Sequence, residues 1–437
     1  MKIITKKFLS LLVLLTLIFS LSLNAVSCTS EAGSDTIFSK ETLYNNVIAE
    51  SDSSLDFVWE YLDRWSFPLF DKGKVKKVEK LYRDHYYKEF PESFTIAKAV
   101  ALDFIENTYD KIDLSSVQKV SDAILTAFVA TIGDKYSFYR TNEQYDDYKS
   151  NMSGSFVGIG VNVQTTLVDG GIFVSSPLRN SPAEKAGVLA NDIIIKIDGE
   201  LVSELGYQEA VNKIKGKSGT DVVITVRRGE NVLDITVTRG PVIELTVDYY
   251  ITEDNIGYID INSFKENTDE LFCDAIDYMK ENNVRAIVYD VRDNGGGYLS
   301  TVVNMLDYIA PDGMTLVSFS NDYGRPDKAK DGHSFFIPTV VLCNGATASA
   351  AELFTAGMRD ISALGHFPIT IVGQKTYGKG IMQNSYTLSD GSALTITVAY
   401  YYPPCGTHYD GEGITPRVII PQKNAQLDGA FEEARKF

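Results

Sequence analysis

The sequence predicts a multidomain α+β protein with three successive regions and a C-terminal tail. Apolar residues recur at helical spacing across much of residues 41–150, which predicts an N-terminal helical domain. Short β-branched runs separated by turn residues fill residues 151–242 and predict a β-rich domain with two helices. Strands then alternate with helices over residues 243–425, as in an α/β core, and residues 426–437 are expected to form the tail. A chain of 437 residues is long enough for two or three domains.

The first 27 residues have the features of an export signal. Three lysines precede an apolar run over residues 8–23, and the small residues Ala25 and Ser27 follow it. The run is short for a membrane span. The next residue, Cys28, completes an Ala-Val-Ser-Cys segment that resembles a bacterial lipoprotein box. We therefore predict an exported, lipid-anchored protein outside the cytoplasmic membrane, with residues 28–40 as a polar tether. Signal cleavage beside an incidental cysteine is the alternative.

The overall charge argues against two classes of partner. The chain carries 41 basic and 58 acidic side chains, a formal net charge of -17. Such an acidic protein is not expected to bind nucleic acid, and we expect it to contact a membrane only through the lipid at Cys28. Besides Cys28 the chain has three cysteines, Cys273, Cys343 and Cys405, and this odd number at unrelated spacings indicates neither a disulfide framework nor a zinc site. No metal and no cofactor are predicted.

The N-terminal helical region shows two apolar stripes at i, i+3, i+4 and i+7. One runs from Val58 to Trp65 and the other from Leu125 to Ile132. Each stripe is best interpreted as a packing face, and one use for such faces would be a homodimer through these helices. The aromatic-rich segment Asp134–Arg140 closes the region, and a core or interface role is favoured for it over ligand binding.

The β-rich domain combines five expected strands with two expected helices. The strands are Val157–Val163, Ile172–Ser176, Asp192–Ile197, Val222–Arg227 and Val232–Thr238, and the helices lie near Ser181–Gly187 and over Tyr207–Lys215. This order, with Ser-Pro-Ala-Glu-Lys-Ala-Gly at the first helix, resembles a bacterial PDZ domain. The resemblance implies a carboxylate-binding loop formed by Gly158, Ile159, Gly160 and Val161. An extended peptide tail would pair with the adjoining strand edge, and Tyr207 and Val211 would form the other wall.

The C-terminal domain repeats a strand, a glycine-containing turn and a helix. Ile256–Ile261, Arg285–Arg292 and Ile337–Cys343 are the expected strands, and helical spacing follows each of them. Short crossovers of this kind place the connecting loops together at one edge of a parallel sheet.

Ser349 follows the third of these strands in Asn-Gly-Ala-Thr-Ala-Ser-Ala-Ala-Glu. The small residues predict a tight turn, and Ser349 then lies at the first turn of a helix. Free backbone N–H groups there favour an anion, such as the oxyanion that a nucleophilic serine creates. The alternative is a serine that only caps the helix.

A nucleophilic serine needs a base, and the four histidines (His85, His333, His366 and His408) lie in no recognisable catalytic setting. A buried lysine is an alternative base, because burial favours its neutral form. Lys379 is the candidate, since glycines on both sides allow the backbone to approach closely. Residues 373–379 also satisfy the start of a phosphate-binding loop, but Gly380 stands where a Ser or Thr is required, which argues against nucleotide binding.

At this point the chain is identified by resemblance as a member of the carboxy-terminal processing, or tail-specific, proteases. The motifs occur in the order of that family: Tyr136–Tyr139, the PDZ motifs, Asp290–Gly297, Asn344–Glu352, Gly378–Gly380 with Gln383, and Gly413–Pro416. The resemblance implies a crotonase-like ββα core and a Ser–Lys dyad. Ser349 would attack the scissile carbonyl, Lys379 would be general base and acid, and Gln383 would orient the lysine amine. Backbone N–H groups of Gly296 and Ala350 would hold the oxyanion, and proteins or peptides with accessible apolar C-termini would be the substrates. Glu352 would stabilise the turn, and an ordinary helix residue is the alternative for it.

Some positions depart from the family pattern. Gly295 replaces a usual proline, Ala351 replaces a common serine, and Cys405 stands in a segment that is usually Pro-Ser-Gly-Arg. The Ser349–Lys379 spacing is also longer than usual, and a loop bulge over Asp360–Phe367 is expected to hold the extra residues.

Two other functions compete with the protease. The first is a catalytically inactive PDZ scaffolding protein, and the presence of Ser349, Lys379 and Gln383 together argues against it. The second is a relative that degrades cytosolic peptides with a histidine-containing site, which the export signal and the Ser–Lys pairing disfavour.

Overall fold

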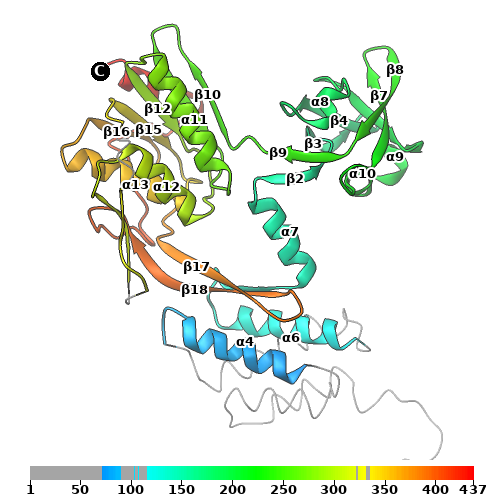
Figure 1. Cartoon of the computed structure of the whole chain (residues 1–437), viewed down its shortest axis with the longest axis horizontal. Helices are drawn as coiled ribbons and strands as arrows, with labels where there is room; N and C mark the ends of the chain where they lie inside the picture. Colours follow the sequence, from blue (N-terminus) through cyan, green and yellow to red (C-terminus); the bar gives the residue numbers. More distant parts are fainter. Residues whose placement is uncertain (1–70, 90–102, 104–106, 108–115, 321–322, 331–334) are drawn as a thin grey trace, which may run out of the picture. The chain divides into compact units, whose positions relative to one another are not determined.

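The computed structural model describes residues 71–89, 103, 107, 116–320, 323–330 and 335–437 (Figure 1). The predicted leader, Cys28, the tether, the stripe from Val58 to Trp65 and His333 lie outside these residues. Contacts divide the chain into one unit of residues 1–72 and 91–131 and a second unit of residues 73–90 and 132–437. Within the described ranges, no helix has the length and apolar character that a membrane crossing requires.

The longest described segment of the first unit is helix α6 (Val117–Thr131). Leu125, Phe128 and Val129 are buried, as expected for the packing face that this apolar stripe predicts. Ile132 lies just beyond the end of the helix.

The second unit contains residues 73–90 and 132–150 of the predicted helical region. Helix α4 (Lys72–His85) is followed along the described chain by β1 (Phe138–Arg140) and α7 (Asn142–Met152). Strand β1 pairs antiparallel with β18 (Ala393–Tyr402), so the last three residues of the aromatic segment form a strand, whereas Tyr136 lies in the turn before it. Helix α7 begins with a capping box between Thr141 and Gln144.

Residues 155–243 form the predicted β-rich domain. A sheet in the order β3-β4-β5-β7-β8 contains β3 (Val161–Val168), β4 (Gly171–Pro177), β5 (Ile193–Ile197), β7 (Asp221–Arg228) and β8 (Asn231–Thr238). The short strand β6 (Glu200–Leu201) pairs with β5, and a separate ladder joins β2 (Ser155–Gly158) to β9 (Gly240–Ile243). The expected single strand over Val157–Val163 is therefore wrong: the chain breaks at Gly160, whose φ of 76° is unfavourable for other residues.

The two predicted helices of this domain are confirmed, and a third short helix lies between them. Helix α8 (Pro182–Lys185) begins at the cap Ser181, and α10 (Tyr207–Ile214) follows α9 (Val202–Leu205). These helices and the sheet enclose a core that includes Val174, Ile194, Ala210 and Val226.

The C-terminal domain is built on a six-stranded sheet in the order β10-β11-β12-β15-β16-β19. Its strands are β10 (Val247–Ile251), β11 (Ile256–Ile261), β12 (Ala286–Asp290), β15 (Thr339–Cys343), β16 (Ile369–Gly373) and β19 (Val418–Ile419). All neighbours from β11 onward pair in parallel, which confirms the predicted βα repeats and brings their loops to one edge.

Helices cover both faces of this sheet. Helices α11 (Thr268–Glu281), α12 (Leu299–Ile309) and α13 (Ala350–Ala363) pack around Phe272, Leu306 and Phe354 in the larger core. Helix α14 (Lys423–Ala434) covers the other face with Ala430, Phe431 and Ala434. The expected tail at residues 426–437 is thus mostly a packed helix, because its apolar residues complete this second core.

A second sheet adds β17 (Ile381–Thr387), β13 (Thr315–Phe319) and β14 (Asp327–Lys328) to the β1–β18 pair. Strand β17 begins two residues after Lys379, where a phosphate-binding loop would need a helix. The expected bulge at Asp360–Phe367 is partly wrong, because α13 continues through Ala363 and only the following residues form a loop.

Candidate active site

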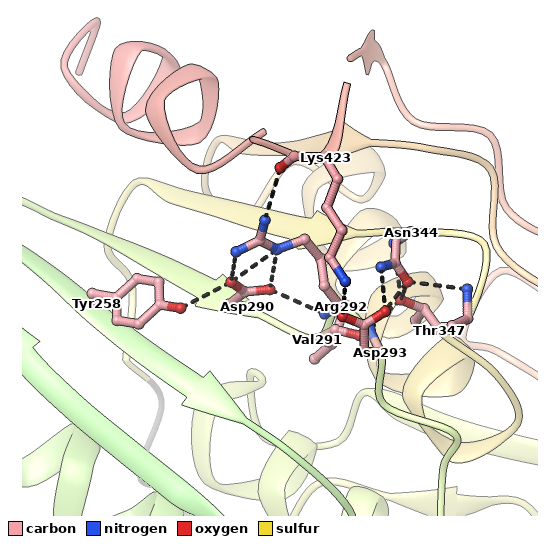
Figure 2. A network of polar contacts seen from close by, with 9 residues as sticks. Tyr258, Asp290, Val291, Arg292, Asp293, Asn344, Thr347 and Lys423 are labelled. Atoms are coloured by element: carbon pink, nitrogen blue, oxygen red, sulfur yellow. Dashed lines mark hydrogen bonds and ion pairs between the residues drawn. The ribbon is translucent and has the colours of Figure 1, made fainter. Parts of the chain in front are cut away.

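The site begins where β12 and β15 end at the same edge of the sheet. The side chain of Asn344 accepts the N–H of Asp293 at 3.1 Å and donates back to the Asp293 carboxylate at 2.9 Å. The Ala348 N–H donates to the Asn294 carbonyl at 3.0 Å, and the Thr347 hydroxyl donates to the Val291 carbonyl at 2.7 Å. Figure 2 shows how the contacts of Asn344 with Asp293 and of Thr347 with Val291 join the two loops.

A buried ion pair fixes the end of β12. Asp290, 2% exposed, receives hydrogen bonds from Arg292 at 2.6 Å and from the Tyr258 hydroxyl at 2.8 Å (Figure 2). Lys423 at the start of α14 donates to Asp293 at 2.8 Å. The strand end carries charge, and each buried charge has a hydrogen-bonded partner, as a low-dielectric site requires.

Ser349 occupies the strand–turn–helix position that the sequence predicts. It caps α13 with φ of 57° and ψ of −121°, a conformation that costs a residue with a side chain of the order of 1–3 kcal/mol. The surrounding contacts must hold this strain in place. A strained turn of this kind presents a side chain at the top of a sheet, as in known nucleophile elbows.

Glu352, one turn into α13, joins the Ser349 loop to the Lys379 loop. Its carboxylate is 0% exposed and accepts the backbone N–H of Ser349 at 3.0 Å. It also accepts the Thr376 hydroxyl at 2.6 Å and the N–H groups of Gly378 and Lys379, each at 2.7 Å. One buried carboxylate therefore sets the position of both predicted catalytic residues. The sequence assigned Glu352 only to stabilising the turn.

The C-terminal motif around Gly413 supports the same loop from the other side. The Ile414 N–H donates to the Thr376 hydroxyl at 2.7 Å, and the Gly380 N–H donates to Asp410 at 2.9 Å. A side chain at Gly413, where φ is 72°, would meet the Thr376 carbonyl oxygen at 2.3 Å. This close approach explains why the family motif needs glycine there.

The amine of Lys379 lies in a partly desolvated position. Burial lowers the pKa of Lys379, and the nearby Asp134, Tyr377 and Asp410 oppose that shift. The Nζ atom lies 4.6 Å from the ring centroid of Tyr136 and forms no hydrogen bond within the described part of the chain. Tyr136 is thus a site residue that the sequence interpretation, which favoured core packing for this segment, did not predict.

Tyr401 on β18 links the two loops a second time. Its hydroxyl donates to the Lys379 carbonyl at 3.0 Å. Burial raises the pKa of Tyr401, and interactions with Tyr409 and Ser349 counteract the rise. No motif in the sequence indicated this residue.

Gly296 and Ala350 lie together beside Ser349, as an oxyanion site requires. A Cβ atom on Gly296 would stand 2.9 Å from the Ser349 Cβ and 3.0 Å from the Ala350 nitrogen. The Gly296 N–H, however, donates to the buried Asn294 side chain at 2.9 Å. Ala350 is the first residue of α13, where the N–H has no acceptor within the helix.

Gln383 lies on β17, and its side chain is turned to β18. Its amide donates to Thr397 at 3.3 Å and to the Ile381 carbonyl at 3.4 Å. No hydrogen bond joins it to Lys379 among the described residues.

The described histidines are structural neighbours of aromatic rings. His85 stacks on Tyr386, His366 on Phe336, and His408 lies against Tyr400 and Tyr402. None of these four contacts involves Ser349.

The predicted peptide-binding residues lie along one border of the β-rich domain. Val161 begins β3, the edge strand of its sheet, and α10 with Tyr207 and Val211 packs near β3. Gly158 ends β2, and Gly160 follows at the chain break. Ile159 is 1% exposed and belongs to the domain core, so its side chain does not face a ligand, although its backbone remains part of the loop.

Comparison with known proteins agrees with this arrangement. Residues 255–420 match the model of peptidase family S41, and residues 173–228 match that of the PDZ domain. A CtpA-like serine protease of Staphylococcus haemolyticus is 35% identical over 80% of this chain and 66% of its own length. The carboxy-terminal processing protease CtpA of Bacillus subtilis is 33% identical over 74% of this chain and 69% of its own length.

A solved structure from Bacteroides fragilis, described as an S41 protease, superposes with a TM-score of 0.50. It is 16% identical and covers 80% of this chain and 91% of that one, so it supports the fold alone. With these relatives and its PDZ and S41 domains, the chain belongs to the carboxy-terminal processing proteases of peptidase family S41.

Proposed function

We propose that this chain is a serine endopeptidase that cleaves peptide bonds with a Ser349–Lys379 dyad. The observation that carries the proposal is the buried carboxylate of Glu352, which binds the backbone of both residues. Ser349 and Lys379 lie in two loops that are distant in the sequence. A buried carboxylate that binds both loops fits a site in which the two side chains must be held together to act on one substrate.

In the proposed reaction, the Ser349 oxygen attacks the scissile carbonyl, and the neutral amine of Lys379 takes the proton of the serine hydroxyl. The protonated lysine then gives this proton to the leaving amine, and water hydrolyses the acyl-enzyme by the same route. Burial supports this role, because it lowers the pKa of Lys379 and so favours the neutral form.

The Ala350 N–H would donate to the oxyanion, with the Gly296 N–H as its partner. Gly296 would have to release Asn294 to do so, and Gln383 would have to leave Thr397 to reach the lysine amine. We therefore place these two contacts in the substrate-bound state. Catalytic hydrogen bonds often tighten only when substrate binds.

Cleavage of a loosely folded protein with an apolar C-terminus tests the dyad. Wild-type protein should cleave it, and Ser349→Ala and Lys379→Ala should each abolish cleavage while leaving the melting temperature within a few degrees. Cleavage that survives Lys379→Ala would mean that another base acts. A stable wild type that binds the tail and cuts nothing would favour the inactive scaffolding protein.

We also propose that the PDZ domain recruits substrates by their C-terminal tails. The edge strand β3 and helix α10 offer a strand to pair with and an apolar wall, the arrangement that β-augmentation needs. A peptide that ends in a free apolar carboxylate should bind, and the same peptide with a C-terminal amide should bind at least about tenfold more weakly, because it has lost its charge. Equal affinity for the two peptides would exclude carboxylate recognition.

Export with a lipid anchor at Cys28 remains a proposal from the sequence. The support is the leader of residues 1–27 and the Ala-Val-Ser-Cys segment that ends in this cysteine. Labelled fatty acid should be incorporated into the wild type in cells and not into Cys28→Ala. Labelling of the variant would place the lipid elsewhere.

A further inference from the structure

The ring of Tyr136 is the group that lies against the lysine amine. The Lys379 Nζ atom is 4.6 Å from the ring centroid, within the range in which an aromatic face attracts a cation. Within the described residues, no carboxylate accepts a hydrogen bond from this amine. A lysine that must become charged during a reaction therefore has an aromatic ring as its immediate neighbour.

Tyr136 is held in a rigid turn. Its N–H donates to the Asp134 side chain at 3.1 Å, and the Ser137 N–H donates to the Asp134 carbonyl at 3.1 Å. The Ser137 hydroxyl donates to Asp134 and accepts the Thr397 N–H of β18 at 3.0 Å. The turn is thus attached to β18. This strand pairs with β17, and β17 begins two residues after Lys379.

Several charged and titratable groups near the amine influence its charge, but within the described residues none of them forms a hydrogen bond with it. Asp134, Tyr377 and Asp410 favour the charged lysine, whereas burial and the cation of Lys135 disfavour it. Lys135 lies 4.7 Å from the same Tyr136 ring and donates to the Tyr377 hydroxyl at 3.2 Å. Asp410 is already bonded to the Gly380 N–H.

We propose that Tyr136 is a positioning residue for Lys379. Its ring keeps water from the neutral amine before the reaction and offers its π face to the ammonium that forms when the amine takes the Ser349 proton. In that step the serine oxygen forms a bond to the carbonyl carbon, the carbonyl electron pair moves to oxygen, and the proton moves to Nζ. The proposal rests on the dyad proposed above.

Two variants of the full chain separate the ring from its hydroxyl. Tyr136→Phe keeps the π face, and we expect its limiting rate at high pH to stay within about threefold of wild type, because only the hydroxyl is lost. Tyr136→Leu keeps an apolar cover without the π face, and its limiting kcat/KM should fall about five- to tenfold. Because the π face stabilises the charged form, its removal lowers the pKa of Lys379. The acid limb of the pH profile should then move to lower pH.

The outcomes distinguish this inference from the proposed function. An inactive wild type, or an active Lys379→Met, would reject the dyad itself. A wild-type rate and acid limb in Tyr136→Leu would overturn the role of Tyr136, and so would a loss in Tyr136→Phe as large as that in Tyr136→Leu. If Tyr136→Leu melts more than a few degrees below wild type, Tyr136→Met takes its place, and its acid limb should also move to lower pH. A wild-type pH profile in Tyr136→Met would then overturn the proposal.

Discussion

The serine side and the lysine side of the candidate site are built in different ways. Ser349 lies in one continuous segment, in which a buried strand, a turn of small residues and a helix follow one another. Lys379 obtains its surroundings from distant segments, including the turn at Asp134–Ser137, Asp410 and the carboxylate of Glu352. The comparison indicates that local structure positions the nucleophile, whereas tertiary packing sets the chemistry of the base.

The largest expected effect comes from changing the base without removing its charge. Lys379→Arg should lower kcat/KM by at least about 10⁴-fold, because a guanidinium stays protonated and cannot accept the serine proton. Lys375→Arg, an exposed change in the same loop, should leave the rate unchanged. Steady-state kinetics on one substrate compare the two. Substantial activity in Lys379→Arg would mean that a residue other than Lys379 is the general base.

The second-largest effect is expected at Glu352, whose carboxylate joins the serine side to the lysine side. Glu352→Gln puts an amide NH₂ where N–H donors now point, so we expect a loss of about 100–1,000-fold in kcat/KM and about 2–4 kcal/mol in the free energy of unfolding. The exposed Glu412→Gln makes the same change of charge nearby and should have little effect. Kinetics and chemical denaturation measure both quantities. If Glu352→Gln is as stable and active as Glu412→Gln, the two sides do not depend on each other.

The serine side alone is tested at two adjacent glycines. Gly296→Ala places a methyl group 2.9 Å from the Ser349 Cβ at φ of 105°, and we expect kcat to fall about 10- to 100-fold. Gly295→Ala meets no atom within 4 Å and should keep the wild-type rate. Equal rates for the two variants would show that the backbone at Gly296 takes no part in the reaction.

The smallest expected effect is a shift of the pH profile from the lysine side. Burial and, to a lesser extent, the Lys135 cation lower the pKa of Lys379, so activity should rise with pH as the amine loses its proton. Lys135→Met removes the neighbouring cation and should raise that pKa. The acid limb then moves to higher pH, opposite to Tyr136→Leu, with a limiting rate within about twofold of wild type. Because Lys135 is exposed, the shift should shrink in high salt. A shift that does not depend on salt would argue against an electrostatic cause.

The sequence by itself determined most of the elements and the family. Strand β11 agrees with its expected bounds, and β12, β15 and α10 agree closely, because alternating or helical apolar spacing is a local property that the fold preserves. The strand, turn and helix around Ser349 are likewise encoded within a few residues. The ordered motifs named the protease family, which the similarity to CtpA of Bacillus subtilis confirms.

Only the tertiary structure decided what surrounds those residues. The sequence favours a core or interface role for Tyr136 and does not single out Tyr401, because a residue's neighbours across a sheet cannot be read from its own segment. The expected tail is helix α14, whose weak apolar pattern gains meaning only against the sheet that it covers. Glu352 had been assigned to the turn, yet three of its four partners lie in the Lys379 loop. Hydrogen bonds and burial between distant segments depend on the folded chain, so they set the environment of Lys379 in a way that local sequence patterns could not predict.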